Sequence, residues 1–156
     1  MKGSQKVIDA LNDALADELA AINQYMVHAE MAEDWGYGKF GEYVEERAIA
    51  EMKHAEKLIA RILFLEGQPV VSDIRAVHIG DMIDKGLEND RKAELEAVTK
   101  YNKIIKLCVA ENDQGSKEMM DGLLMDEEAH LDAIEERLDQ IAQMGLQNYL
   151  TTIVGE

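Results

Sequence analysis

The residues best suited to chemistry in this sequence form two sets with the same internal spacing. In each set a Glu is followed 33 residues later by a Glu-x-x-His motif, and the second set begins 76 residues after the first. A Glu and a His three positions apart share one face of a helix. On that face the carboxylate can bridge two metal ions while the imidazole binds one of them. The candidate metal ligands are Glu18, Glu51 and His54 in the first set and Glu94, Glu127 and His130 in the second.

The charge of this ligand set predicts two divalent cations. Four buried carboxylates carry four negative charges, which would be strongly unfavourable inside a protein unless cations neutralised them. Oxygen and nitrogen ligands without a thiolate suit iron or manganese, although zinc could also bind. The Glu of each Glu-x-x-His motif is the predicted bridging ligand, and the upstream glutamates are terminal. With iron, the expected reaction is oxidation of two Fe(II) ions by oxygen or peroxide, which is a ferroxidase activity.

Four long helices are needed to bring these side chains together. Apolar residues spaced three and four apart run through each segment and are interrupted by the candidate ligands. Hairpin turns at 35–38 and 112–115 would place Glu18 beside Glu51 and Glu94 beside Glu127. Segment 66–80 is long enough to run the length of a bundle, so the third helix would start parallel to the second. The helices are predicted over 4–34, 39–65, 81–111 and 116–144.

Two segments outside these helices are rich in apolar residues. Those of the long connection 66–80 would pack against the bundle or against a neighbouring chain. The tail that follows Gly145 is too short to be stable alone, so we expect it to dock on another surface.

Composition limits the class of protein. The 156 residues contain one Pro, and aromatic residues make up only 5%, which favours an all-α domain spanning 1–156. The N-terminus lacks an apolar signal segment, and no stretch is long and apolar enough to span a membrane. The lone Cys108 suits a reducing compartment, so we expect a soluble cytoplasmic protein. The net charge of -16 argues against nucleic-acid binding and is compatible with concentrating cations.

Several other residues have weaker claims to a role. Tyr25 and Tyr101 lie on the same stripes as the upstream glutamates, where they could hydrogen-bond the carboxylates, carry electrons or simply fill the core. His28 and His78 lack the Glu-x-x-His context and are predicted at the surface or in loops. Cys108 is predicted to be a small core residue.

The sequence resembles the bacterioferritins over nearly its full length. The resemblance rests on short blocks at 1–3 (MKG), 21–25 (AINQY), 51–55 (EMKHA), 61–67 (RILFLEG), 126–130 (DEEAH) and 144–150 (MGLQNYL). It implies a ferritin-like four-helix bundle with a long crossover between helices two and three and a short fifth C-terminal helix. It also implies a shell of 24 chains, built from dimers, that stores ferric mineral.

The same resemblance assigns roles to particular residues. The six candidate ligands would form the ferroxidase centre. Met52 would be the axial ligand of a haem shared with a second subunit across a twofold interface. The resemblance also implies that this haem assists iron release and that a small ferredoxin delivers the electrons. On a helix, Met52 lies about 100° around from Glu51, facing away from the metal ligands.

The sequence departs from some bacterioferritins at three positions. Glu46 and Ala50 replace an additional iron-binding His and Asp, and Ala133 replaces a Trp near the site. We therefore expect neither that accessory iron site nor a Trp electron donor.

Two other classes of function remain to be weighed. A peroxide-reducing di-iron enzyme similar to rubrerythrin would normally carry a Cys-rich domain, whereas Cys108 is the only cysteine here. A metal-free helical interaction module would have to bury four carboxylates without counter-charge.

Overall fold

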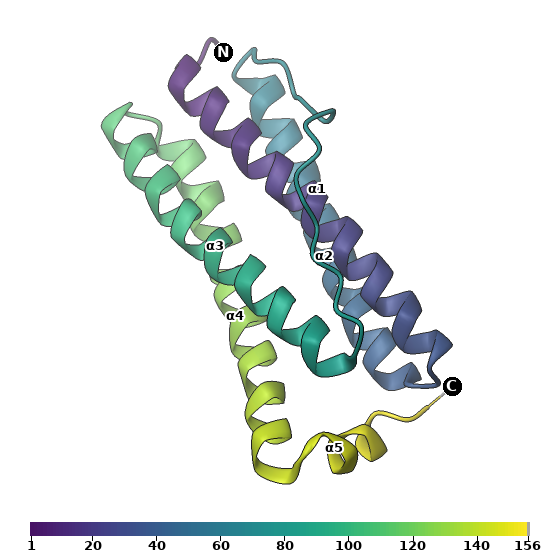
Figure 1. Cartoon of the computed structure of the whole chain (residues 1–156). Coiled ribbons are helices and arrows are strands. Elements are labelled where there is room, and N and C mark those ends of the chain that lie inside the picture. The colour runs from purple at the N-terminus through teal and green to yellow at the C-terminus, as the bar shows by residue number, and fades with distance from the viewer. Residues whose placement is uncertain (156) are drawn as a thin grey trace.

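The computed structural model describes residues 1–155, which form a bundle of four long helices followed by a short fifth helix (Figure 1). This architecture confirms the predicted all-α fold, and every predicted boundary of the long helices lies within two residues of the observed one. The helices are α1 (Gln5–Asp34), α2 (Gly38–Phe64), α3 (Ile83–Ala110), α4 (Gln114–Met144) and α5 (Leu146–Thr152).

The connection between α2 and α3 runs the length of the bundle (Figure 1). As predicted, α1 and α2 form one antiparallel hairpin, α3 and α4 form the other, and α3 starts parallel to α2. Polar contacts hold the crossover on α1, because Asn12 Nδ2 donates to Gln68 O at 3.0 Å and Arg75 Nη2 contacts Asp13 at 2.8 Å. Apolar side chains of the crossover face outward instead, and Ile74 is 92% exposed in the single chain.

Local sequence signals explain where the helices begin and end. Ser4 caps α1, and Asp113 caps α4 by accepting a hydrogen bond from Ser116 N at 2.9 Å. Gly36 adopts a φ of 84° in the first turn, and Gly145 adopts 82° between α4 and α5. These positive φ values favour glycine, which carries no Cβ.

The C-terminal tail docks on the turn between α1 and α2. Tyr149 and Ile153 are buried, and Gly38 N donates to Gly155 O at 2.9 Å. The sequence predicted docking of this tail, and the structure adds its location.

Two apolar clusters fill the bundle on either side of its middle. Because the candidate ligands lie between them, both ends of the polar site are closed by packed side chains. No helix among residues 1–155 is long and apolar enough to cross a membrane. The larger members of one cluster are Leu11, Leu15, Leu58, Tyr101 and Met120, and those of the other are Tyr25, Phe40, Val44, Leu87 and Ile134.

Candidate metal centre

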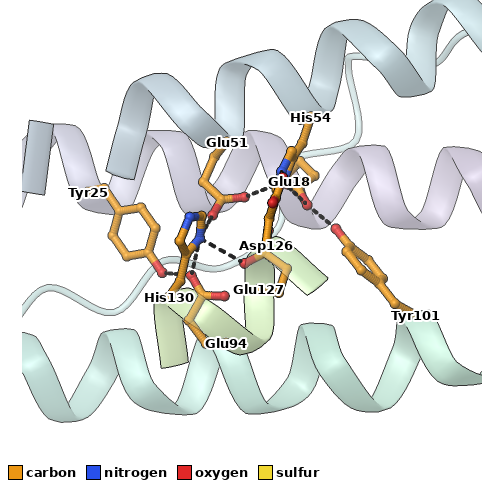
Figure 2. A network of polar contacts seen from close by, with 9 residues as sticks. All are labelled: Glu18, Tyr25, Glu51, His54, Glu94, Tyr101, Asp126, Glu127 and His130. Carbon is orange, nitrogen blue, oxygen red and sulfur yellow. Dashed lines mark hydrogen bonds and ion pairs between the residues drawn. The ribbon is translucent and has the colours of Figure 1, made fainter. Parts of the chain in front are cut away.

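All four long helices contribute side chains to a buried cluster at the middle of the bundle (Figure 2). Each member interrupts the apolar stripe of its helix, so helix packing carries it inward. None is more than 5% exposed. The structure brings together all six residues singled out in the sequence: Glu18 from α1, Glu51 and His54 from α2, Glu94 from α3, and Glu127 and His130 from α4.

The six side chains divide into two overlapping groups of four. Glu18 and His54 complete the first group, and Glu94 and His130 complete the second. Glu51 and Glu127 belong to both groups. Within each group the potential ligand atoms lie within 4.8 Å of one another. Two neighbouring cation positions that share two carboxylates would produce this arrangement.

Both imidazoles turn Nδ1 toward the carboxylates. Nδ1 of His54 lies 2.8 Å from Glu127 Oε1 and 3.3 Å from Glu51 Oε2. Nδ1 of His130 lies 3.0 Å from Glu51 Oε1 and 3.4 Å from Glu127 Oε2. The two rings are 6.1 Å apart and nearly parallel, at 18°. The two halves of the sequence therefore form the two halves of one approximately symmetric site.

Two tyrosines extend this symmetry. Tyr25 donates to Glu94 Oε1, and Tyr101 donates to Glu18 Oε1, so each helix of the α1/α3 pair holds the terminal carboxylate of the other (Figure 2). Burial, followed by the charge of the adjacent carboxylates, raises the pKa of both phenols well above the usual range, which keeps them protonated as donors. Tyr25 and Tyr101 thus fix carboxylates of the cluster as well as filling the core.

One oxygen on each terminal carboxylate has no hydrogen-bond partner. Glu18 Oε2 and Glu94 Oε2 are both buried and unpaired among residues 1–155. A buried carboxylate oxygen without a partner is costly, and a bound cation is the natural way to satisfy it. The ligand atoms are therefore suited to two divalent metal ions that bind both oxygen and nitrogen, such as iron or manganese.

The protonation equilibria also reflect crowded negative charge. Burial, followed by the charge of Glu18, raises the pKa of Glu51 well above its usual value. Burial and the hydrogen bond and charge of Glu127 do the same for Glu94. Burial would lower the pKa of His54, but hydrogen bonds and charges from Glu127 and Glu18 outweigh it and raise the pKa to about 10. Without metal, protons supply the positive charge that the cluster requires.

A cavity leads to the cluster from the side of the crossover. It has a volume of about 250 Å³, lies between α1, α3 and the crossover, and is lined at its inner end by all four glutamates of the cluster. Asp17, Arg75 and Glu96 line other parts of it. The cavity therefore connects the buried carboxylates with the side of the bundle on which the crossover runs.

The prediction for His28 is wrong, because this residue is buried rather than at the surface or in a loop. Only 6% of it is exposed, and its Nδ1 lies 3.0 Å from Asp90 Oδ1. Its Nε2 accepts a hydrogen bond from Gly80 N at 2.9 Å, while Gln24 Oε1 accepts one from His78 N, also at 2.9 Å. The crossover passes over α1 at this point, and the side chains of His28 and Gln24 accept hydrogen bonds from its backbone N–H groups. His78 itself is an exposed loop residue, as expected.

Asp126 is a contact of the cluster that the sequence did not single out. Its Oδ2 lies 2.9 Å from Nε2 of His54, on the side of the ring away from the other carboxylates. The available signal was its position immediately before Glu127, although nothing in that position specifies a contact across to α2.

Met52 and Cys108 occupy contrasting environments. Met52 is 45% exposed on α2 and lies outside the cluster, with the exposed Ile49 one turn before it. Its side chain is therefore accessible at the surface of the single chain. Cys108 is fully buried in the core, where burial raises the pKa of its thiol to about 11.

Comparison with known proteins supports a common family. A family model described as a ferritin-like domain matches residues 8–144. The chain is 43% identical to the bacterioferritin of Brucella melitensis and 41% identical to that of Rhodobacter capsulatus, in each case over 96% of this chain and 92% of the relative. It is 37% identical to the bacterioferritin of Streptomyces coelicolor, over 99% of this chain and 92% of that protein.

Proposed function

The chain belongs to the bacterioferritins within the ferritin-like family, and on this basis we propose that it stores iron and oxidises Fe(II) to Fe(III) at the buried Glu/His cluster. The observation that carries the proposal is the pair of overlapping ligand groups that share Glu51 and Glu127. Without bound metal, burying four carboxylates this close together would cost much free energy, because their ligand atoms lie within 4.8 Å of one another in each group.

In the proposed reaction two Fe(II) ions are substrates and each loses one electron. Oxygen takes up the two electrons and two protons to form hydrogen peroxide, or peroxide takes up the same number to form two water molecules. Glu51 and Glu127 hold both ions at once, which keeps the two electron donors adjacent. Glu18 and Glu94 are the terminal carboxylates. Added negative charge from the ligands favours the ferric product over the ferrous substrate.

The residues around the cluster assist this reaction by holding its carboxylates in place and by burying them. Tyr25 and Tyr101 hold the terminal carboxylates by hydrogen bonds from opposite helices. The two apolar clusters close the site along the bundle axis, so the cavity beside the crossover is the proposed entry for Fe(II). Burial of the six side chains strengthens the electrostatic interactions among them.

We propose that the single domain 1–156 assembles as a cytoplasmic shell of 24 copies, built from dimers, with ferric mineral inside. The exposed apolar residues of the crossover and of α2 support such contacts between copies, because one chain leaves them uncovered.

The exposed Met52 supports the proposal of a shared haem. One chain offers one thioether, so a twofold pair would supply both axial ligands. We propose that a haem held there by Met52 would supply a one-electron carrier between a small ferredoxin and the stored ferric iron during release.

The experiment that tests the proposal combines a rate with an assembly measurement. Glu51→Ala and Glu127→Ala should each abolish the rapid phase of Fe(II) oxidation in stopped-flow experiments, because each removes a bridge. Glu56→Ala is the matched control, since Glu56 is an exposed glutamate of α2 outside the cluster. Native mass spectrometry should show the same shell for all four proteins. Undiminished oxidation in the bridge variants would contradict the site, and a wild-type monomer or dimer would contradict the shell.

A further inference from the structure

The two imidazoles of the cluster differ at the ring nitrogen that faces away from the glutamates. His54 Nε2 is 2.9 Å from Asp126 Oδ2 (Figure 2). His130 Nε2 has no hydrogen-bond or ion-pair partner among residues 1–155, where the hydrogen bond and ion pairs of that ring are made by Nδ1. The candidate ligands are therefore the same in the two halves of the site, but only one of the two histidines has a hydrogen-bond partner behind it.

The internal repeat of the sequence accounts for this difference. The offset of 76 residues that relates Glu51 to Glu127 also relates Ala50 to Asp126. A carboxylate thus stands beside the bridging Glu of α4, while a methyl group stands at the equivalent position of α2. Asp126 reaches across to His54, and Ala50 has no side-chain acceptor to offer to His130.

The contact with Asp126 determines how His54 can bind a metal. An ionised carboxylate only accepts hydrogen bonds, so Nε2 of His54 must carry the proton. In the neutral imidazole this leaves the lone pair on Nδ1, which already points at the shared carboxylates. A carboxylate behind a histidine also fixes the ring orientation and makes the ligand nitrogen more basic. His130 lacks these constraints.

We propose that Asp126 is a positioning residue that makes the two metal positions unequal, so that the position next to His54 binds its ion first and more tightly. This inference rests on the proposed function, since it requires metal at the cluster. Asp126 is about half exposed, with 54% of its side chain accessible, so solvent screens its charge. The hydrogen bond to Nε2, rather than the added negative charge, is therefore the main contribution.

Anaerobic binding of Co²⁺ to the assembled, metal-stripped protein tests the proposal without any turnover. Crystals of the shell loaded with less than one Co²⁺ per chain should show higher anomalous occupancy beside His54 than beside His130. Asp126→Ala should weaken binding beside His54 by about 10- to 100-fold, as removal of a partner behind a metal ligand generally does. Asp126→Asn should weaken Co²⁺ binding less than Asp126→Ala does, because the amide oxygen can still accept a hydrogen bond from Nε2 of His54. Glu128→Gln is the matched control, since it removes an exposed charge two residues away that forms no hydrogen bond or ion pair with either histidine within residues 1–155.

The reciprocal variant guards against a simple folding defect. Ala50→Asp should supply the missing partner to His130 and bring the two occupancies closer together. Equal occupancies in the wild type, or equal losses in Asp126→Ala and Glu128→Gln, would overturn the proposal while leaving the metal centre intact. Failure of the wild type to bind Co²⁺ at the cluster at all would instead contradict the proposed function.

Discussion

Replacing Glu94 by Gln should stabilise the metal-free protein and weaken its stabilisation by metal. Glu94 is buried, accepts a hydrogen bond from Tyr25 through Oε1, and leaves Oε2 without a partner. Gln has the same shape, can still accept from Tyr25, and places an N–H where the unpaired oxygen lies. The substitution removes one of four like charges while preserving the packing.

The direction of the effect follows from the raised pKa of Glu94. Burial, followed by the hydrogen bond and charge of Glu127, raises that pKa well above the ordinary value of 4.5, so the folded state binds a proton that the unfolded state releases. The free energy of unfolding then falls by about 1.4 kcal/mol per pH unit between the unfolded and folded pKa values. A buried polar atom without a partner costs about 1–3 kcal/mol, so we expect Glu94→Gln, which removes one, to be more stable than wild type by about that amount at pH 7.

The sign of the pH dependence is specific. Below the ordinary pKa of Glu the carboxyl is protonated in both states, so wild type and variant should have nearly equal stability. The advantage of Gln should appear as the pH rises through that value and should level off above the raised pKa. For a chain of this length, 1 kcal/mol corresponds to roughly 2–4 °C in Tm.

The assay is thermal unfolding of metal-stripped shells between pH 4 and pH 7, with and without Co²⁺. Each occupied site adds about 2.7 kcal/mol when free metal exceeds its Kd 100-fold. Glu94→Gln removes a terminal ligand and should lose most of one such contribution. Glu88→Gln is the control, because Glu88 is an exposed residue of the same helix that lies outside both the cluster and the lining of the cavity. The reasoning is refuted if metal-free Glu94→Gln is less stable than wild type at pH 7, or if the difference does not change with pH.

Two further substitutions test other parts of the molecule. Asp113→Ala removes the N-cap of α4 and a 2.8 Å ion pair with Arg61, and should cost about 2 kcal/mol in chemical denaturation at neutral pH. Burial would raise the pKa of Asp113, but hydrogen bonds from Ser116 and Arg61 lower it, so this stabilisation should be lost as the pH falls through the lowered pKa; an undiminished difference in acid would contradict the assignment. Met52→Leu should remove the low-spin haem absorption spectrum while leaving Fe(II) oxidation largely intact, and an unchanged spectrum would exclude axial ligation.

The helices and the six clustered side chains could be predicted from the sequence because their causes are local and repeated. Apolar spacing identifies the buried face of each helix, and the turns fix which positions meet across a hairpin. The length of segment 66–80 sufficed to predict the parallel start of α3. These features depend on helical periodicity and chain length alone.

The error at His28 has a different origin. Its burial depends on where the crossover backbone passes, since Gly80 N donates to Nε2 and Asp90 lies against Nδ1. An irregular segment has no period from which its path could be read. A lone histidine on α1 therefore gives no sign that it satisfies a loop 52 residues away. The contact between Asp126 and His54 was missed for a related reason, because it joins helices through a residue outside the repeated motif.

The two halves related by the 76-residue repeat have the same residue types at the six candidate ligand positions and different residue types beside them. The four carboxylates that we propose as bridging and terminal ligands are glutamates in both halves, and an uncompensated buried charge at these positions would destabilise the bundle. The residues that flank the glutamate of each Glu-x-x-His motif are partly or fully exposed, so a charge or a thioether there costs little. Asp126 opposite Ala50, and Met52 opposite Glu128, are differences of this kind. If the proposals hold, the first makes the two metal positions unequal and the second places haem on only one face of the bundle. The residues beside the ligands would then make the two halves of an approximately symmetric metal centre functionally different.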